Sequence, residues 1–215
     1  KINSLGLSTW FHPSVEIQRN DQVEFDHLKA FSNKGYDPKN IIHPGDLLHV
    51  DFGITYLRLN SDIQEHAYVL KPAEKDAPDY LKNALTIGNR LQDILTNQFA
   101  LNKTGNNILA DALAQAKKEN INATIYTHPI GAHGHAAGPT IGMWDQQNGV
   151  PGSGDYPMYY NTAYSIELNA AVEIKEWKKP IRIMLEQDGF FDQTGFRYIS
   201  GRQTKLHLVG NPNWQ

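Results

Sequence analysis

Cysteine is absent from the 215-residue chain, so disulfide bonds and thiolate metal ligands are excluded. No apolar run approaches the roughly 20 residues that a membrane helix needs. The net charge of −3 argues against a general binder of nucleic acid or of acidic membranes. No stretch rich in proline, glycine and serine divides the chain. We therefore predict one domain, with residues 1–40 as a wrapping segment and residues 41–209 as the core.

Methionine is also missing at the first position, because the chain begins at Lys1. This start indicates a processed or excised piece, whose targeting signal, if it has one, is not visible. We expect a soluble protein, with a cytoplasmic location slightly favoured and export left open. The sequence leaves a homodimeric assembly open as well.

Two short β-rich runs stand close together in the first third of the chain. Residues 47–52 form the first and residues 60–70 the second, and the link between them is too short for a helical crossover. We therefore predict two antiparallel strands with an irregular connection. Alternation places Asp51 on the face opposite Val50 and Phe52, which are expected to point to the core. An acid in such a strand is costly unless it is paired or binds a metal, and capping or pairing is the commoner case.

The middle and the end of the chain show regular periodicities. Apolar residues recur at spacings of three and four over 80–99 and 105–119, which predicts two amphipathic helices packed on a sheet. Further strands are expected at 121–126, 163–169, 181–188, 196–199 and 204–209. The polar and aromatic loop at 143–161 is long enough to be functional.

Three histidines, His128, His133 and His135, lie in a glycine-rich loop. Glycine lets the backbone approach closely and imidazole supplies a nitrogen ligand, so the loop is typical of a metal or substrate site. For one isolated histidine, local hydrogen bonding in a surface loop is the commoner explanation.

Two more acids, Glu167 and Glu186, stand in apolar strands. By strict alternation Glu167 shares a face with Ser165, unless the pleat is broken nearby. Together the acids and one imidazole form a five-member set in chain order: Asp51, Asp62, His133, Glu167 and Glu186. Four converging carboxylates repel one another unless two divalent cations neutralise them. The set therefore predicts a dinuclear metal site.

The chain resembles the catalytic domain of the pita-bread metallopeptidases, which include methionine aminopeptidase, Xaa-Pro aminopeptidase and prolidase. The resemblance spans roughly residues 41–200 and implies an α+β fold, in which a curved antiparallel sheet is covered by helices. It rests on five features in order: the run from Pro44 to Gly53, the eleven-residue step from Asp51 to Asp62, His133-Gly134, Tyr164-Ser165-Ile166-Glu167, and Glu186 ahead of an apolar strand and turn.

The resemblance implies a role for each member of the set. Asp51 would chelate one metal ion, Asp62 and Glu186 would bridge, and His133 with Glu167 would complete the other. Ligation by oxygen and nitrogen suits Mn, Co, Zn or Fe(II), and the sequence does not choose among them.

Proton transfer and oxyanion stabilisation are expected from neighbouring side chains. Glu167 would relay a proton to the leaving amine, as the resemblance implies. The donor to the tetrahedral oxyanion is expected among three histidines: His12, His128 and His135.

The chain departs from the family pattern in two places. The histidine loop reads Ala132-His133-Gly134-His135-Ala136, where the family usually has Gly-His-Gly-Ile/Val-Gly, so we expect this protein's own specificity to lie there. The last ligand also has a rival, Gln203. Glu186 is preferred because residues 190–195 resemble the family's closing strand and turn, and because glutamine is a neutral, weaker ligand.

The resemblance implies a metal-dependent aminopeptidase with peptide substrates. The Xaa-Pro type is favoured by the strand around residues 164–168 and by the long loop at 143–161. The alternatives are a methionine aminopeptidase, a prolidase-type dipeptidase, a metal-free C–N hydrolase like creatinase, and a relative that only binds. Retention of all five ligand types argues against the last two.

Overall fold

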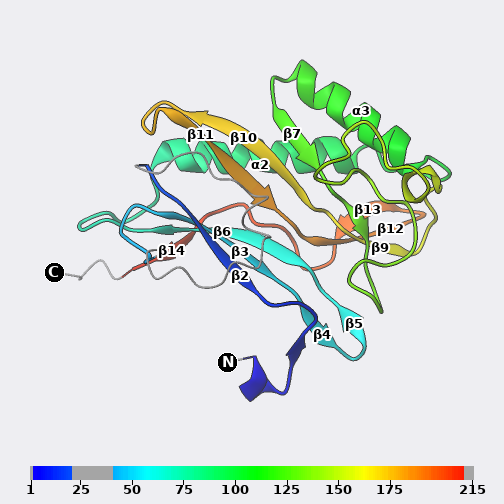
Figure 1. Cartoon of the computed structure of the whole chain (residues 1–215), viewed down its shortest axis with the longest axis horizontal. Coiled ribbons are helices and arrows are strands. Elements are labelled where there is room, and N and C mark those ends of the chain that lie inside the picture. Colours follow the sequence, from blue (N-terminus) through cyan, green and yellow to red (C-terminus); the bar gives the residue numbers. More distant parts are fainter. Residues whose placement is uncertain (1, 21–40, 211–215) are drawn as a thin grey trace.

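The computed structural model describes residues 2–20 and 41–210, in which two α-helices lie against four small β-sheets (Figure 1). The helices are α2 (Asp79–Thr96), α3 (Gly105–Lys118) and the short 3-10 helices η1 (Asn3–Leu5) and η2 (Ser153–Asp155). The strands are β1 (Ser8–Thr9), β2 (Ser14–Gln18), β3 (Leu47–Phe52), β4 (Ile54–Tyr56), β5 (Leu59–Asn60), β6 (Ile63–Val69), β7 (Asn122–Ile125), β8 (His128–Pro129), β9 (Thr162–Ser165), β10 (Leu168–Ile174), β11 (Lys179–Leu185), β12 (Asp188–Asp192), β13 (Gly195–Tyr198) and β14 (His207–Val209).

Both predicted helices are present, and their apolar faces pack on the sheets. α2 covers β10 and β11 and also contacts α3 (Figure 1). α3 begins after Thr104, whose hydroxyl accepts a hydrogen bond from the Asn107 backbone N–H at 3.2 Å and so caps the first turn. Within the described residues, neither helix is long and apolar enough to cross a bilayer.

Gly88 marks the closest approach of α2 to β11. A Cβ at this position would lie 2.5 Å from Ile183 Cγ2 and 3.1 Å from Leu185 Cδ1. Alanine favours a helix over glycine by about 1 kcal/mol, but overpacking a core costs about 1–3 kcal/mol. We therefore expect Gly88→Ala to lower the free energy of unfolding by as much as about 2 kcal/mol in urea titrations. Thr86→Ala, on the exposed face of the same helix, is the control and should stay within about 0.5 kcal/mol of wild type.

The expected antiparallel pair in the first third is confirmed as β3 and β6, in a sheet of order β14-β6-β3-β2. The register places Asp51 opposite Gln64. The connection between the two strands is a small hairpin of β4 and β5. At the sheet edges, β2 from the N-terminal segment pairs with β3, while β14 runs parallel to β6. Residues 21–40 of the expected wrapping segment lie outside the described residues.

The prediction that Val50 and Phe52 point to the core is wrong. Both are only partly buried and belong to neither buried apolar cluster, whereas Leu47 and His49, on the other face of β3, are buried. This face of the sheet is covered by β11, which contacts β6 and whose Met184 N–H donates to the buried His66 Nε2 at 2.9 Å. Its polar groups also bond to one another, since His49 Nε2 lies 2.8 Å from Gln64 Oε1. Asp51 of β3 therefore lies on the inner face of the sheet, opposite the buried Gln64 of β6.

Two long strands expected near the C-terminal half are each interrupted. β9 ends at Ser165 and β10 begins at Leu168, while β11 ends at Leu185 and β12 begins at Asp188. β10 pairs with β11 in a sheet of order β11-β10-β7, and β9 pairs with β12 in a sheet of order β13-β12-β9-β8. The pleat is thus broken beside Glu167, the alternative that the sequence left open, and Glu186 lies in the matching break.

Candidate metal centre

The four acids of the expected ligand set come together at the junction of the sheets. Asp51 lies near the end of β3, Asp62 directly precedes β6, and the two glutamates occupy the two strand interruptions. Among the described residues, three overlapping groups have one potential ligand atom per residue within 4.8 Å of one another: Asp51, Asp62 and Glu186; His128, Glu167 and Glu186; Asp62, His128 and His135.

His128 is the buried imidazole of this cluster, with a relative exposure of 2%. Its Nδ1 donates to the Pro129 carbonyl oxygen at 3.1 Å, which leaves Nε2 directed at the carboxylates. Nε2 lies 3.6 Å from Glu186 Oε1 and 3.9 Å from both Asp62 Oδ2 and Glu167 Oε2. His128 therefore presents one ring nitrogen to three of the four acids.

His133, the histidine of the predicted ligand set, is not among the residues that the structure groups around the acids. His133 is exposed and belongs to none of the ligand groups found among residues 2–20 and 41–210. The loop turns back at this point, since the Ala136 N–H donates to the Pro129 carbonyl at 2.9 Å, and His133 stands at the turn. His128 comes beside the acids because β8 pairs with β9, with His128 opposite Ser165. One feature of the sequence favours strand β8: His128 precedes Pro129, and a residue before proline favours extended backbone.

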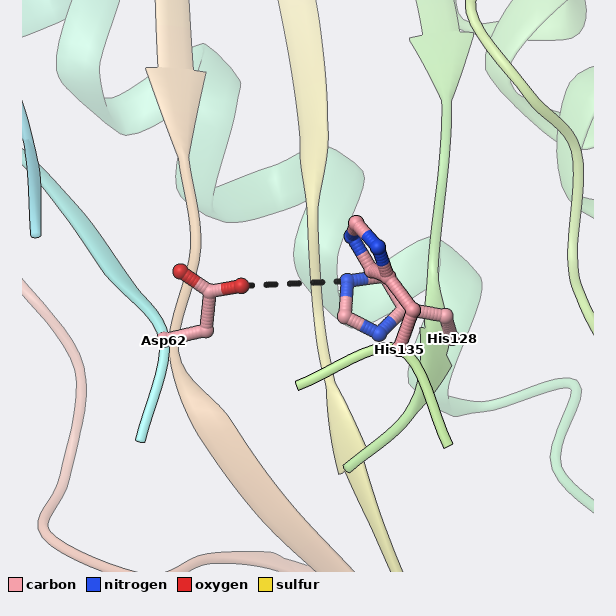
Figure 2. Close-up of side chains that lie close together, drawn as sticks. All are labelled: Asp62, His128 and His135. Carbon is pink, nitrogen blue, oxygen red and sulfur yellow. Dashed lines mark ion pairs between the residues drawn. The ribbon is translucent and has the colours of Figure 1, made fainter. Parts of the chain in front are cut away.

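His135 lies beside His128, with ring centroids 4.5 Å apart and planes nearly perpendicular. Figure 2 shows the two imidazoles on one side of the site and Asp62 across from them. The Trp10 ring packs edge-on against His135 at 5.5 Å, and its indole N–H donates to the Ser61 carbonyl at 2.8 Å. Burial and the neighbouring His128 lower the pKa of His135. The neutral imidazole can donate or accept a hydrogen bond at the rim of the site.

His12, the third histidine expected as an oxyanion donor, does not join the other two. It is exposed, and its Nδ1 lies 2.9 Å from the carbonyl oxygen of the adjacent Pro13. It also belongs to no ligand group of the described residues. The N-terminal segment instead contributes Trp10, which the sequence gave no reason to select.

Burial and mutual repulsion dominate the electrostatics of the acids. Burial raises the pKa of Asp51 to about 7, and the nearby Glu186 adds to the shift. The pKa values of Asp62 and Glu167 are also raised, again through burial first and Glu186 second. A carboxylate is costly in such surroundings unless a positive charge compensates it, so the metal-free cluster favours proton uptake.

Three buried atoms of the cluster have no hydrogen-bond partner: Asp51 Oδ1, Asp62 Oδ1 and His128 Nε2. Buried polar atoms are nearly always hydrogen-bonded, so atoms without a partner need an explanation. All three can be ligand atoms for a divalent cation, and all three residues belong to the ligand groups described above. The residues present therefore fit a metal centre of oxygen and nitrogen ligands.

Two buried polar residues beside the cluster were not foreseen. Asp188 accepts the Asp62 backbone N–H through both oxygens at 3.3 Å, and burial raises its pKa to about 7. The Gln64 amide lies between the two glutamates. Gln203, the rival ligand, serves elsewhere: its side chain accepts from the His66 N–H and donates to the His66 carbonyl, both at 2.7 Å.

Comparison with known proteins gives matches in structure alone. No family model matches the chain. No curated protein matches it either. Among solved structures, the X-Pro aminopeptidase from Thermotoga maritima MSB8 superposes with a TM-score of 0.65 at 18% identity, over 93% of this chain and 49% of that one. The chain has the pita-bread fold. This confirms the fold expected from the sequence.

Two other proteins with the pita-bread fold also match. The N-terminal domain of FACT complex subunit SPT16 from Eremothecium gossypii superposes with a TM-score of 0.68 at 12% identity, over 94% of this chain and 43% of that one. The methionine aminopeptidase from Rickettsia prowazekii gives 0.54 at 15% identity, over 73% of this chain and 65% of that one. The chain spans about half the length of the first peptidase structures it matches. At these identities, the pita-bread fold is what the likeness establishes.

Proposed function

We propose that the chain is a metal-dependent aminopeptidase of the Xaa-Pro type, which removes the N-terminal residue of peptides. The proposed ligands of two divalent cations are Asp51, Asp62, His128, Glu167 and Glu186. His128 takes the place that the sequence assigned to His133. The observation that supports the proposal is a cluster of four acids, three of which face the buried His128 imidazole. Three potential ligand atoms of this cluster have no hydrogen-bond partner.

When bound, two divalent cations supply a Lewis acid for the scissile carbonyl and lower the pKa of an attacking water. His128 would hold one of them through Nε2, which faces the carboxylates because Nδ1 is fixed on the Pro129 carbonyl. Glu167 accepts the proton of the attacking water and passes it to the leaving amine. His135, at the open side of the site, donates a hydrogen bond to the developing oxyanion.

The choice of the Xaa-Pro type has support from the length of chain that superposes. The Xaa-Pro dipeptidase from Bacillus anthracis and the X-Pro aminopeptidase both cover more than nine-tenths of this chain, at 94% and 93%, against 73% for the methionine aminopeptidase. A prolidase-type dipeptidase is the neighbouring alternative. The metal is Mn, Co, Zn or Fe(II), all of which accept these ligands.

A second function is favoured by one specific observation, the likeness to the SPT16 domain, which is named as part of a complex and not as a peptidase. By that reading, the fold would serve as a binding module and the acids would need no metal. The two proposals differ in whether the cluster takes up cations.

Metal analysis is therefore the first test. Protein purified without chelator and incubated with Mn(II) or Co(II) should retain about two equivalents and should hydrolyse an Xaa-Pro peptide, and treatment with EDTA should remove both properties. Fewer than about one equivalent would overturn the dinuclear site and favour the binding module.

A further inference from the structure

The side chain of Gln64 lies between the two glutamates of the proposed metal centre. Its Nε2 donates to Glu167 Oε1 at 2.7 Å and to Glu186 Oε2 at 2.6 Å. Gln64 itself is buried, with 2% relative exposure. One carboxamide nitrogen carries two N–H groups, so a single neutral side chain can give one hydrogen bond to each carboxylate.

The orientation of this amide is fixed from behind by a histidine. His49 Nε2 lies 2.8 Å from Gln64 Oε1, and His49 Nδ1 lies 2.9 Å from Glu16 Oε2. With its oxygen facing the His49 N–H, the amide can only direct its nitrogen toward the glutamates. Strand register brings this chain of contacts together, since Glu16 is opposite His49 in the β2 and β3 pair.

The backbone of Gln64 is fixed to the same place. Its N–H donates to the Glu186 carbonyl at 2.9 Å, and its carbonyl accepts from the Glu186 N–H at 3.2 Å and from Gln187 Nε2 at 3.1 Å. Gln64 and Glu186 thus form a bridge between β6 and the interruption that separates β11 from β12. Backbone and side chain together allow this residue little movement relative to Glu186.

We propose that Gln64, supported by His49 and Glu16, is a positioning residue that holds the carboxylates of Glu167 and Glu186 ready for metal. This inference rests on the proposed function. A hydrogen bond uses one lone pair of each carboxylate oxygen and leaves others for a cation. A neutral amide also holds two like charges together without the positive charge that would compete with the metal. Partners behind metal ligands orient them in this way and typically change affinity by about 10–100-fold.

The test compares Gln64→Leu with Gln18→Leu, using Co(II) alone as the probe. Gln18 is the matched control, because it is also a buried glutamine whose amide bonds to one segment, the Arg182 backbone, at 2.7 Å in both directions. We expect Gln64→Leu to weaken Co(II) binding by about 10–100-fold in calorimetric titrations and to shift the visible Co(II) absorption bands. Gln18→Leu should lose thermal stability while keeping wild-type affinity and spectrum.

Each outcome has one meaning. Unchanged affinity and spectrum in Gln64→Leu would overturn the positioning role and leave the proposed function standing, and so would equal losses in both variants. Failure of the wild type to bind Co(II) would overturn the proposed function and this inference with it. Should Gln64→Leu not fold, Gln64→Asn keeps an amide but withdraws it by one methylene, so the same loss of affinity is expected in a folded protein.

Discussion

Glu186→Ala should abolish metal uptake and turnover on an Xaa-Pro peptide. Glu186 belongs to two of the three ligand groups, and both of its oxygens accept hydrogen bonds, Oε1 from Ser165 at 2.5 Å and Oε2 from Gln64 at 2.6 Å. The substitution therefore removes charge shared by both proposed metal positions. Loss of a residue that only hydrogen-bonds to a metal ligand typically lowers affinity or activity by up to about 100-fold, and we expect the loss of turnover in Glu186→Ala to be larger. Metal content and kinetics should be measured on the same sample.

Gln203→Ala is the control for this experiment. The Gln203 side chain makes two hydrogen bonds to the His66 backbone and lies outside the ligand groups of the described residues. The variant should therefore keep its metals, while its free energy of unfolding falls by about 1–3 kcal/mol. Wild-type turnover in Glu186→Ala would show that the last ligand has been assigned to the wrong strand. Loss of metal in Gln203→Ala alone would point the same way.

Three single substitutions in the histidine loop should separate three roles. His128→Ala should lose metal and turnover together, because the buried Nε2 faces three carboxylates. His135→Ala should keep its metals and lose about 10²–10³-fold in turnover, the usual effect of removing a donor to a developing oxyanion. His133→Ala should change neither, since among the described residues this side chain belongs to none of the ligand groups. Metal analysis beside steady-state kinetics decides among them.

The opposite pattern would restore the assignment made from sequence. Loss of metal in His133→Ala with normal metal content in His128→Ala would return His133 to the ligand set. Near-normal turnover in His135→Ala would mean that this residue only packs against Trp10 and His128.

Most of the fold could be predicted from local sequence patterns. The helices follow from the spacing of their apolar residues, and the antiparallel pairing of β3 and β6 follows from the short link between them. Asp51, Asp62, Glu167 and Glu186 could be selected because acids in apolar strands are costly without a partner. That these four converge follows in the structure from pairing across sheets. The interruption beside Glu167 could be raised only as an alternative, since no glycine or proline marks it in Ile166-Glu167.

Sequence patterns could not identify which histidine of the loop lies beside the acids. His128, His133 and His135 differ little in sequence context, and what separates them is that β8 pairs with β9 and that the loop then turns back at Pro129. The pairing of β8 with β9 joins residues more than thirty positions apart along the chain. Gln64 could not be selected from the sequence either, because a neutral glutamine in a strand does not carry the burial cost that singles out an acid.

The two strand interruptions have a thermodynamic consequence. They put Glu167 and Glu186 between two sheets, close to Asp51 of β3 and to Asp62 at the entry to β6, which belong to a third sheet. Cations held there would cross-link all three sheets. In the unfolded chain the ligands, such as Asp51 and Glu186, are far apart in sequence, so the unfolded state would bind cations more weakly than the folded state. Each bound cation would therefore add about 2.7 kcal/mol to the free energy of unfolding at a cation concentration of one hundred times its Kd. Chelation would lower the melting temperature of the protein as well as remove its proposed chemistry.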